Sequence, residues 1–177
     1  MGLWTHCFRS LPDPQDEYQR RFYVGCRWIF DPFTTGYEKI RGYLVPWYII
    51  ITQFFFTLAF LGVLGSFILV LLFFLCFGPE QRRFIQLITL IGGIMVGVGV
   101  SGGLAVIVFV LTANRDNWML GHSNNFFGWS FALAVAGVIE ALVAGTLFLT
   151  EAHIQKKKRK YLKESQTRFE VEQETKA

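Results

Sequence analysis

The stretch Gly2–Cys26, GLWTHCFRSLPDPQDEYQRRFYVGC, determines how the rest of the chain is interpreted. Its two cysteines, Cys7 and Cys26, lie in polar, proline-containing sequence without the spacing of metal ligands, just ahead of a long apolar run. This arrangement favours a disulfide bond, with two free thiols as the alternative. Because a disulfide needs an oxidising compartment, the stretch is expected to face the cell exterior or the secretory lumen. If the two cysteines pair, the closed loop is worth roughly 3 kcal/mol through the entropy of the unfolded chain.

The composition indicates a membrane protein with one membrane domain. Of the 177 residues, 53% are hydrophobic and 17% aromatic, which is too apolar for an ordinary water-soluble domain. The apolar residues also gather in long blocks, whereas a water-soluble core would disperse them at helical or strand spacing. The formal charge of +4 carries little information as a total, because membrane orientation follows the Lys and Arg of short loops.

Three apolar blocks exceed the roughly 20 residues that a helix needs to cross the hydrocarbon. The predicted transmembrane helices are residues 48–77, 84–112 and 126–150. The connecting segments are predicted to be an extracellular segment 1–47, a cytoplasmic turn 78–83, an extracellular loop 113–125 and a cytoplasmic tail 151–177.

The first segment favours short strands, since aromatic and polar residues alternate along it. Clusters of Pro and Asp predict turns at Leu11–Asp16 and Asp31–Thr35. A short surface helix is expected over Gly36–Leu44, and Pro46 suits the start of the first apolar helix, because its missing N–H costs nothing there.

Basic and aromatic residues orient the helices. Arg82 and Arg83 in the first turn, and Lys156, Lys157, Lys158, Arg159 and Lys160 after the third block, are typical of cytoplasmic flanks. The basic run is also expected to attract anionic lipid. Trp47 and Tyr48 predict an interfacial aromatic belt, and the loop around Trp118 is placed outside. The distal tail is expected to be disordered or weakly helical.

Glycines in the second and third blocks predict close helix packing. Gly93 with Gly97, and Gly99 with Gly103, have the GxxxG spacing. In the third block the corresponding row of small residues is Gly137, Ala141 and Gly145. Packing within this chain is the simpler interpretation, and dimerisation is the alternative.

Glu140 stands in the middle of the third block, with Ala136 and Ala144 four residues to either side. A carboxyl at mid-membrane is expensive, so it is expected to point inward. It could serve as an ion or proton site, or as a protonated or hydrogen-bonded group that fixes helix packing. The packing role is preferred, because no second ionisable residue is visible within the membrane.

The start of the chain raises a difficulty for this topology. The first 45 residues carry six Lys and Arg, and no signal peptide precedes them. Export of such a segment without an upstream helix is difficult. A first span is therefore expected to be missing, as in a fragment, a mispredicted gene start or a short isoform of a four-span protein.

The order GLW, a cysteine, a second cysteine and then Arg41 before a span resembles the first extracellular loop of the claudin and peripheral myelin protein superfamily. The resemblance covers the later half of that loop and spans two to four. It implies an all-α membrane bundle that carries a small disulfide-braced extracellular β-sheet. The family's bundle is left-handed and has four spans, of which three are present here. The signature residues are Gly2, Leu3, Trp4, Cys7, Cys26 and Arg41, and the family implies that Cys7 bonds Cys26.

Several features depart from the vertebrate claudin pattern. The spacing of the two cysteines is longer, the second extracellular loop is short, and the tryptophan that usually precedes GLW is absent. The tail ends in Thr175, Lys176 and Ala177 without the hydrophobic residue that PDZ domains capture. These differences resemble the claudin-type proteins of insect septate junctions, first the Pasiflora type, with the Sinuous, Megatrachea and Kune-kune types as alternatives.

The resemblance implies a structural protein of occluding junctions at the lateral plasma membrane, with other junctional proteins and itself as partners. Aromatic residues of the first segment could anchor such contacts, since aromatic side chains dominate interfaces. They are Trp4, Phe22, Tyr23, Trp28 and Phe33. An ion channel or channel-modulating subunit with Glu140 in the bundle is the alternative. His6, His122 and His153 are scattered and the cysteines are committed to a bridge, so neither catalysis nor a cofactor is expected.

Overall fold

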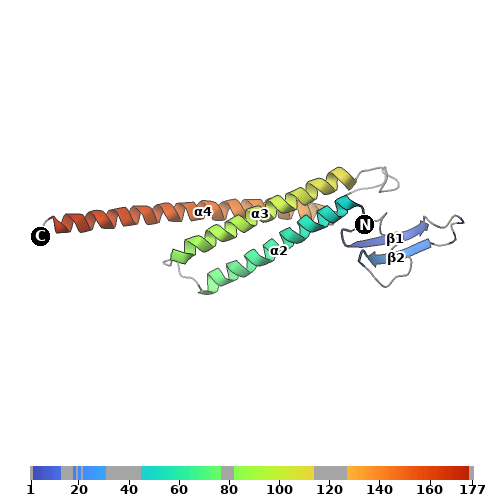
Figure 1. The fold of residues 1–177 in the computed structure, drawn as a ribbon, viewed down its shortest axis with the longest axis horizontal. Helices are drawn as coiled ribbons and strands as arrows, with labels where there is room; N and C mark the ends of the chain where they lie inside the picture. The colour runs from blue at the N-terminus through green and yellow to red at the C-terminus, as the bar shows by residue number, and fades with distance from the viewer. Residues whose placement is uncertain are drawn as a thin grey trace. The chain divides into compact units, whose positions relative to one another are not determined.

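The computed structural model describes residues 2–12, 18, 20, 22–30, 45–76, 82–113 and 127–175. In chain order the elements are β1 (Thr5–Pro12), β2 (Phe22–Trp28), α2 (Trp47–Cys76), α3 (Arg82–Ala113) and α4 (Trp129–Glu174). Figure 1 shows the two strands as an antiparallel pair and the three long helices that follow them. This is the predicted fold class, an all-α membrane bundle with a small disulfide-braced sheet.

The chain divides into two compact units. The first comprises Met1–Phe56 and Leu104–Phe127, and therefore holds the sheet, the start of α2 and the end of α3. The second comprises Thr57–Gly103 and Gly128–Ala177, which hold the remainder of α2 and α3 and the whole of α4.

Several sequence predictions lie outside the described residues. They are the surface helix over Gly36–Leu44, the turn at Asp31–Thr35, most of the turn at Leu11–Asp16, Arg41, Phe33, and the loop around Trp118.

Within the described residues, three helices are long and apolar enough to cross a membrane: Trp47–Leu75, Arg83–Ala113 and the helix Trp129–Glu174. Hydroxyl side chains in these helices are compatible with hydrocarbon, because they donate to carbonyls of their own helix. The Thr52 hydroxyl donates to the Tyr48 carbonyl at 2.9 Å, and the Thr89 hydroxyl to the Ile85 carbonyl at 2.7 Å.

The first helix begins where the sequence suggested. Pro46 directly precedes α2, and its carbonyl accepts the Ile49 N–H at 3.0 Å. Of the two residues expected in an interfacial aromatic belt, only Trp47 is exposed. Tyr48 is instead buried with Ile49 and Ala113, because it lies on the side of α2 that packs within the first unit.

The last helix is much longer than predicted. The expectation of a disordered or weakly helical tail is wrong for the described residues, since α4 continues without a break from Trp129 to Glu174. Residues 151–174 contain neither Gly nor Pro and are rich in Lys, Arg, Glu and Gln, all good helix formers. Pairs four residues apart, Glu151 with Gln155 and Lys160 with Glu164, add local support. In Figure 1 the red part of α4 runs past the ends of the other two helices of its unit.

Small residues form the interface between α3 and α4. A Cβ built on Gly145 would lie 2.8 Å from the Val96 backbone nitrogen, and one on Gly99 would lie 2.5 Å from Leu142. Gly92 faces Leu149 in the same way. Gly92 and Gly99 are seven residues apart, as are Gly145 and the buried Ala152, and a seven-residue period is typical of left-handed helix packing.

The glycine predictions are therefore only partly confirmed. Gly99, Gly103, Ala141 and Gly145 are all part of the packed faces of α3 and α4. The other three predicted packing glycines, Gly93, Gly97 and Gly137, have open space at the Cβ position within this chain. The GxxxG spacing identified the right helices but only one of its two pairs, because the packed face of α3 begins at Gly92, one residue and about 100° away from Gly93.

Two further contacts join α2 to α3 in the second unit. The Ser66 hydroxyl lies 3.2 Å from the Met95 sulfur, and the rings of Phe73 and Phe84 have centroids 4.8 Å apart. Gly62 faces Val98 so closely that a Cβ would clash, and Val98 packs with Ala59 and Ala141 in the core of this unit. All three helices therefore pack together in this unit.

Candidate functional site

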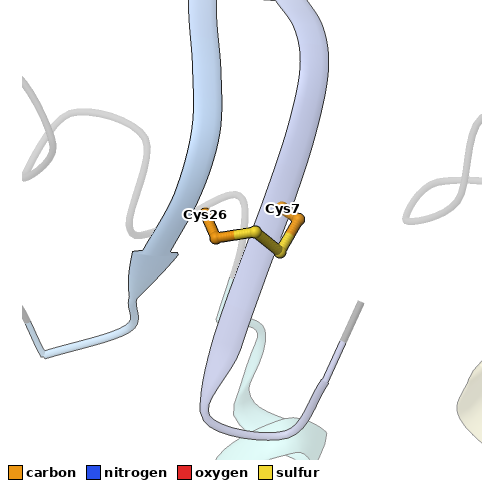
Figure 2. The surroundings of a disulfide bond; sticks show 2 residues. All are labelled: Cys7 and Cys26. Carbon is orange, nitrogen blue, oxygen red and sulfur yellow. A yellow bond between two sulfur atoms is a disulfide. The ribbon is translucent and has the colours of Figure 1, made fainter.

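The two strands are held in a fixed register by the predicted disulfide bond. Cys7 and Cys26 lie directly opposite each other in the antiparallel pair, and their sulfurs are bonded. Figure 2 shows the bridge crossing from one strand to the other. A two-stranded sheet is marginal by itself in water, so this crosslink supplies stability that a small core cannot.

The register is irregular beside the disulfide. A shift lies between Phe8 and Leu11, and the residue opposite Phe8 is Gly25, whose φ is +100°. A side chain would strain this backbone conformation, so glycine is required next to Cys26. The sequence analysis did not single out Gly25, although an isolated glycine within a strand pattern is a known sign of a bulge.

The two faces of β2 differ in an unusual way. Side chains of one alternating set are exposed, and all of its large members are apolar: Phe22 at 54%, Val24 at 64%, Trp28 at 57% and, just beyond the strand, Phe30 at 41%. The opposite set, Tyr23, Arg27 and Ile29, is half-buried or buried. The sheet thus exposes a set whose large members are all apolar and covers a mixed set in which Ile29 lies beside Tyr23 and Arg27, whereas a sheet that packs on a core buries its more apolar side.

The exposed rings form one patch. Trp28 and Phe30 meet edge to face with centroids 5.9 Å apart, and Trp4 lies 6.2 Å from Phe30. We call Trp4, Phe22, Val24, Trp28 and Phe30 the aromatic face. The sequence analysis named three of these residues and missed Val24 and Phe30. Tyr23, which it also named, is half-buried beneath the Arg27 guanidinium, 6.0 Å from the ring centroid.

The covered side of the sheet holds His6, which is 1% exposed and lies opposite Arg27 in the register. Burial lowers the pKa of His6 below its ordinary value of 6.5, because the charged imidazolium is poorly solvated there. The ring is therefore neutral at physiological pH. Together with Ile29, which is fully buried, it fills the space beneath the sheet.

Each of the three residues of the GLW motif makes a different contact that helps to attach the sheet. The Gly2 N–H donates to the Thr5 carbonyl at 2.8 Å and closes a turn. Leu3 packs against Tyr48, Ile49 and Ala113 at the ends of α2 and α3. Trp4 joins the aromatic face, and its carbonyl accepts the Ile29 N–H at 3.1 Å.

Gln53 fastens this motif to the membrane helix. Its side chain is 4% exposed, and its Nε2 donates to the Leu3 carbonyl at 2.7 Å, across fifty residues of sequence. A buried amide on an apolar helix requires such a partner. The sequence analysis missed Gln53, although a lone glutamine six residues into an apolar block was a visible signal.

Glu140 does not point inward among the three described helices. Its side chain is exposed, as are Ala136 and Gly137, while Ala141 and Gly145 make the contacts with the rest of the second unit. The inward position predicted for Glu140 is therefore not met among the three described helices, where the adjacent residue Ala141 lies on the packed face of α4.

The basic run lies on the part of α4 that follows the apolar segment. Lys156, Lys157, Lys158 and Lys160 are exposed, and Arg159 is half-buried. Lys160 pairs with Glu164 at 3.8 Å. In the part of the chain that the structure describes, no group of three or more His, Cys, Asp or Glu residues could hold a metal ion.

These features define a class: a multi-span helical membrane protein that carries a disulfide-braced sheet attached to its helix ends. The family model described as PMP-22/EMP/MP20/Claudin tight junction matches residues 1–150. The chain belongs to this family, whose members are junction-associated structural membrane proteins with four spans, rather than enzymes. Comparison with curated proteins gave no match, and comparison with solved structures gave none either.

Proposed function

We propose that the chain is a structural component of an occluding cell junction, where it contributes to the paracellular diffusion barrier and to adhesion. The observation that carries this proposal is the aromatic face, presented on a braced sheet and attached by Leu3 and Gln53 to the helix ends. Isolated apolar side chains are normal on protein surfaces, but a contiguous aromatic patch marks an interaction site.

The partners proposed are other junctional membrane proteins and further copies of this chain, within one membrane and between cells. The proposed location is the lateral plasma membrane, with the sheet outside and the C-terminus in the cytoplasm. Arg83 and the basic run support this orientation, because short cytoplasmic flanks carry an excess of Lys and Arg. The run from Lys156 to Lys160 would then lie at the inner leaflet and attract anionic lipid.

The long spacing of Cys7 and Cys26 and the short second extracellular loop support a septate-junction type, with the Pasiflora type first. The channel alternative draws no support from the described residues, because Glu140 lies on an exposed face of α4.

The test is passage of a fluorescent dextran across an epithelium depleted of this protein, with the tagged protein imaged in control tissue. Depletion is expected to cause leakage, and the tagged protein is expected to stain the lateral junction. An intact barrier with the protein elsewhere in the cell would contradict the proposal.

Rescue of the depleted tissue tests the aromatic face itself. Trp28→Thr keeps a strand-forming residue but removes the ring, so it is expected to reach the surface and fail to restore the barrier. Tyr18→Thr is the matched control, because Tyr18 is 78% exposed and lies outside both strands. Equal rescue by both variants would show that the aromatic face is not the adhesive surface.

A further inference from the structure

A groove of about 550 Å³ lies between α3 and α4 in the second unit. It is lined by Gln86, Thr89, Leu90, Gly93 and Ile94 of α3 and by Lys156 of α4. The groove is shallow and wide open, so it would hold a ligand along the helix surface rather than enclose it. The groove lies where α3 begins and where the apolar segment of α4 has just ended, so it coincides with one boundary of the predicted membrane spans.

The lining changes character along the groove. Lys156 and Gln86, both exposed, supply an ammonium and an amide. The Thr89 hydroxyl donates to its own helix, which leaves the Lys156 ammonium and the Gln86 amide as the side-chain donors that the lining offers. Leu90, Gly93 and Ile94 make the rest of the lining, which is apolar. Gly93 is seven residues beyond Gln86, about 10 Å along the helix.

The apolar part continues beyond the groove as bare backbone. Gly93 and Gly97, one turn apart, both have open space where a Cβ would stand, so α3 exposes its backbone at both positions. A cationic and polar end joined to an apolar lining matches one chemical class of ligand, an anionic phospholipid. Four further basic residues follow Lys156 on α4, and they favour a negatively charged headgroup at this end.

The acidic residue on α4 closest in sequence to Lys156 is Glu151, which does not line the groove and lies five residues earlier, about 140° around the helix. Glu151 accepts a hydrogen bond from the Gln155 amide at 2.7 Å, which ties its carboxylate to its own helix.

We propose that this groove binds one anionic phospholipid of the inner leaflet. The phosphate lies between Lys156 and Gln86, and the first part of an acyl chain follows Leu90, Gly93 and Ile94. The inference rests on the cytoplasmic placement of the basic run under the proposed function and deepens it, because it replaces diffuse attraction to lipid by a single site.

The test is native mass spectrometry of the full chain released from detergent, with palmitoyl-oleoyl phosphatidylserine as the probe and the phosphatidylcholine of the same chains as the comparison. One phosphatidylserine per chain is expected, with clearly weaker retention of phosphatidylcholine. Lys156→Gln is expected to weaken phosphatidylserine binding about fivefold, the effect of one basic residue on an anionic headgroup. Lys160→Gln removes the same charge from the same run, but Lys160 pairs with Glu164 and does not line the groove, so binding is expected to persist.

A second pair of variants tests the apolar part. Gly93→Leu fills the groove and is expected to lower phosphatidylserine binding, whereas Gly137→Leu adds the same side chain at an open position of α4 and is expected to leave it unchanged. Glycerophosphoserine, which has no acyl chains, is expected not to compete.

Three results would overturn the proposal. Equal losses for Lys156→Gln and Lys160→Gln would indicate diffuse attraction, and equal binding of the two lipids would exclude headgroup recognition. A dimer that Gly93→Leu abolishes, with lipid binding retained, would assign this face to a second copy of the chain. These measurements use purified protein, so failure of the lipid site and failure of the barrier role are separate outcomes.

Discussion

Replacing Gly145 by alanine tests the close packing of α3 and α4 most directly. The new Cβ would lie 2.8 Å from the Val96 backbone nitrogen and 3.2 Å from the Gly92 carbonyl oxygen, where ordinary contact begins near 3.4 Å. Backbone atoms cannot rotate aside as side chains do. The two helices must therefore separate locally by about 0.6 Å, the difference between 2.8 Å and 3.4 Å.

Overpacking of this kind costs about 1–3 kcal/mol. Alanine also favours the helix over glycine by up to about 1 kcal/mol in water, which opposes the loss. Gly137→Ala removes this ambiguity, because it makes the same change eight residues earlier in the same helix, with nothing within 4 Å of the new Cβ. The difference between the two variants isolates the cost of the contact.

The assay is thermal unfolding of the purified full chain in a mild detergent, followed by circular dichroism. For a chain of this length each kcal/mol corresponds to roughly 2–4 °C, so Gly145→Ala is expected to melt several degrees below Gly137→Ala. Gly99→Ala should fall between them, because its closest neighbours are the side-chain atoms of Leu142, which can move. Equal melting temperatures for Gly145→Ala and Gly137→Ala would refute the packing that we describe.

Three further predictions concern the sheet. Gln53→Leu removes the donor to the part-buried Leu3 carbonyl, a loss of about 1 kcal/mol, and hydrogen exchange should become faster over residues 2–8. Gln155→Leu on the exposed tail should leave hydrogen exchange there unchanged. Because burial lowers the pKa of His6, the unfolded chain binds the proton more tightly, so the stability of the sheet is present above pH 6.5 and falls as the pH drops below that value. Melting of the sheet followed by tryptophan fluorescence should occur at a lower temperature at pH 5.5 than at pH 7.5. His6→Gln should make this difference smaller. An equal difference in His6→Gln would show that other groups cause the loss of stability. Cys26→Ser is expected to be retained in the secretory pathway while Cys76→Ser reaches the surface, and normal delivery of Cys26→Ser would contradict a structural role for the bridge.

The helices could be predicted from sequence because long apolar blocks have few alternatives. The expected spans over 48–77 and 84–112 lie alongside α2 at Trp47–Cys76 and α3 at Arg82–Ala113. The helical tail was missed because its polarity was given more weight than its helix-forming residues. Sequence composition shows that residues 151–174 cannot form a core, but a solvated helix does not need one.

The sequence did not show as clearly which face of each helix, or which side of the sheet, is packed against the rest of the structure. Gly92 and Gly93 are adjacent and equally small, and only the position of α4 determines which one packs. On α4, Glu140 and Ala141 are likewise adjacent, and only the position of α3 and α2 determines that Ala141 is the one that packs. In β2 the alternation of apolar and polar residues was visible, but a two-stranded sheet has no core of its own, so alternation alone could not show which side is covered.

The exposed aromatic face follows from the way the sheet is attached. In an isolated soluble sheet, Phe22, Trp28 and Phe30 would be the buried side, and their exposure would favour aggregation. Here the opposite side of the sheet is the covered one, because its side chains His6 and Ile29 are buried. Leu3 and Gln53 then hold this orientation against the ends of the spanning helices, so turning the rings inward would break the hydrogen bond from Gln53 to the Leu3 carbonyl. An apolar surface held outward in this way is stabilised when another molecule covers it, as the proposed adhesive role requires.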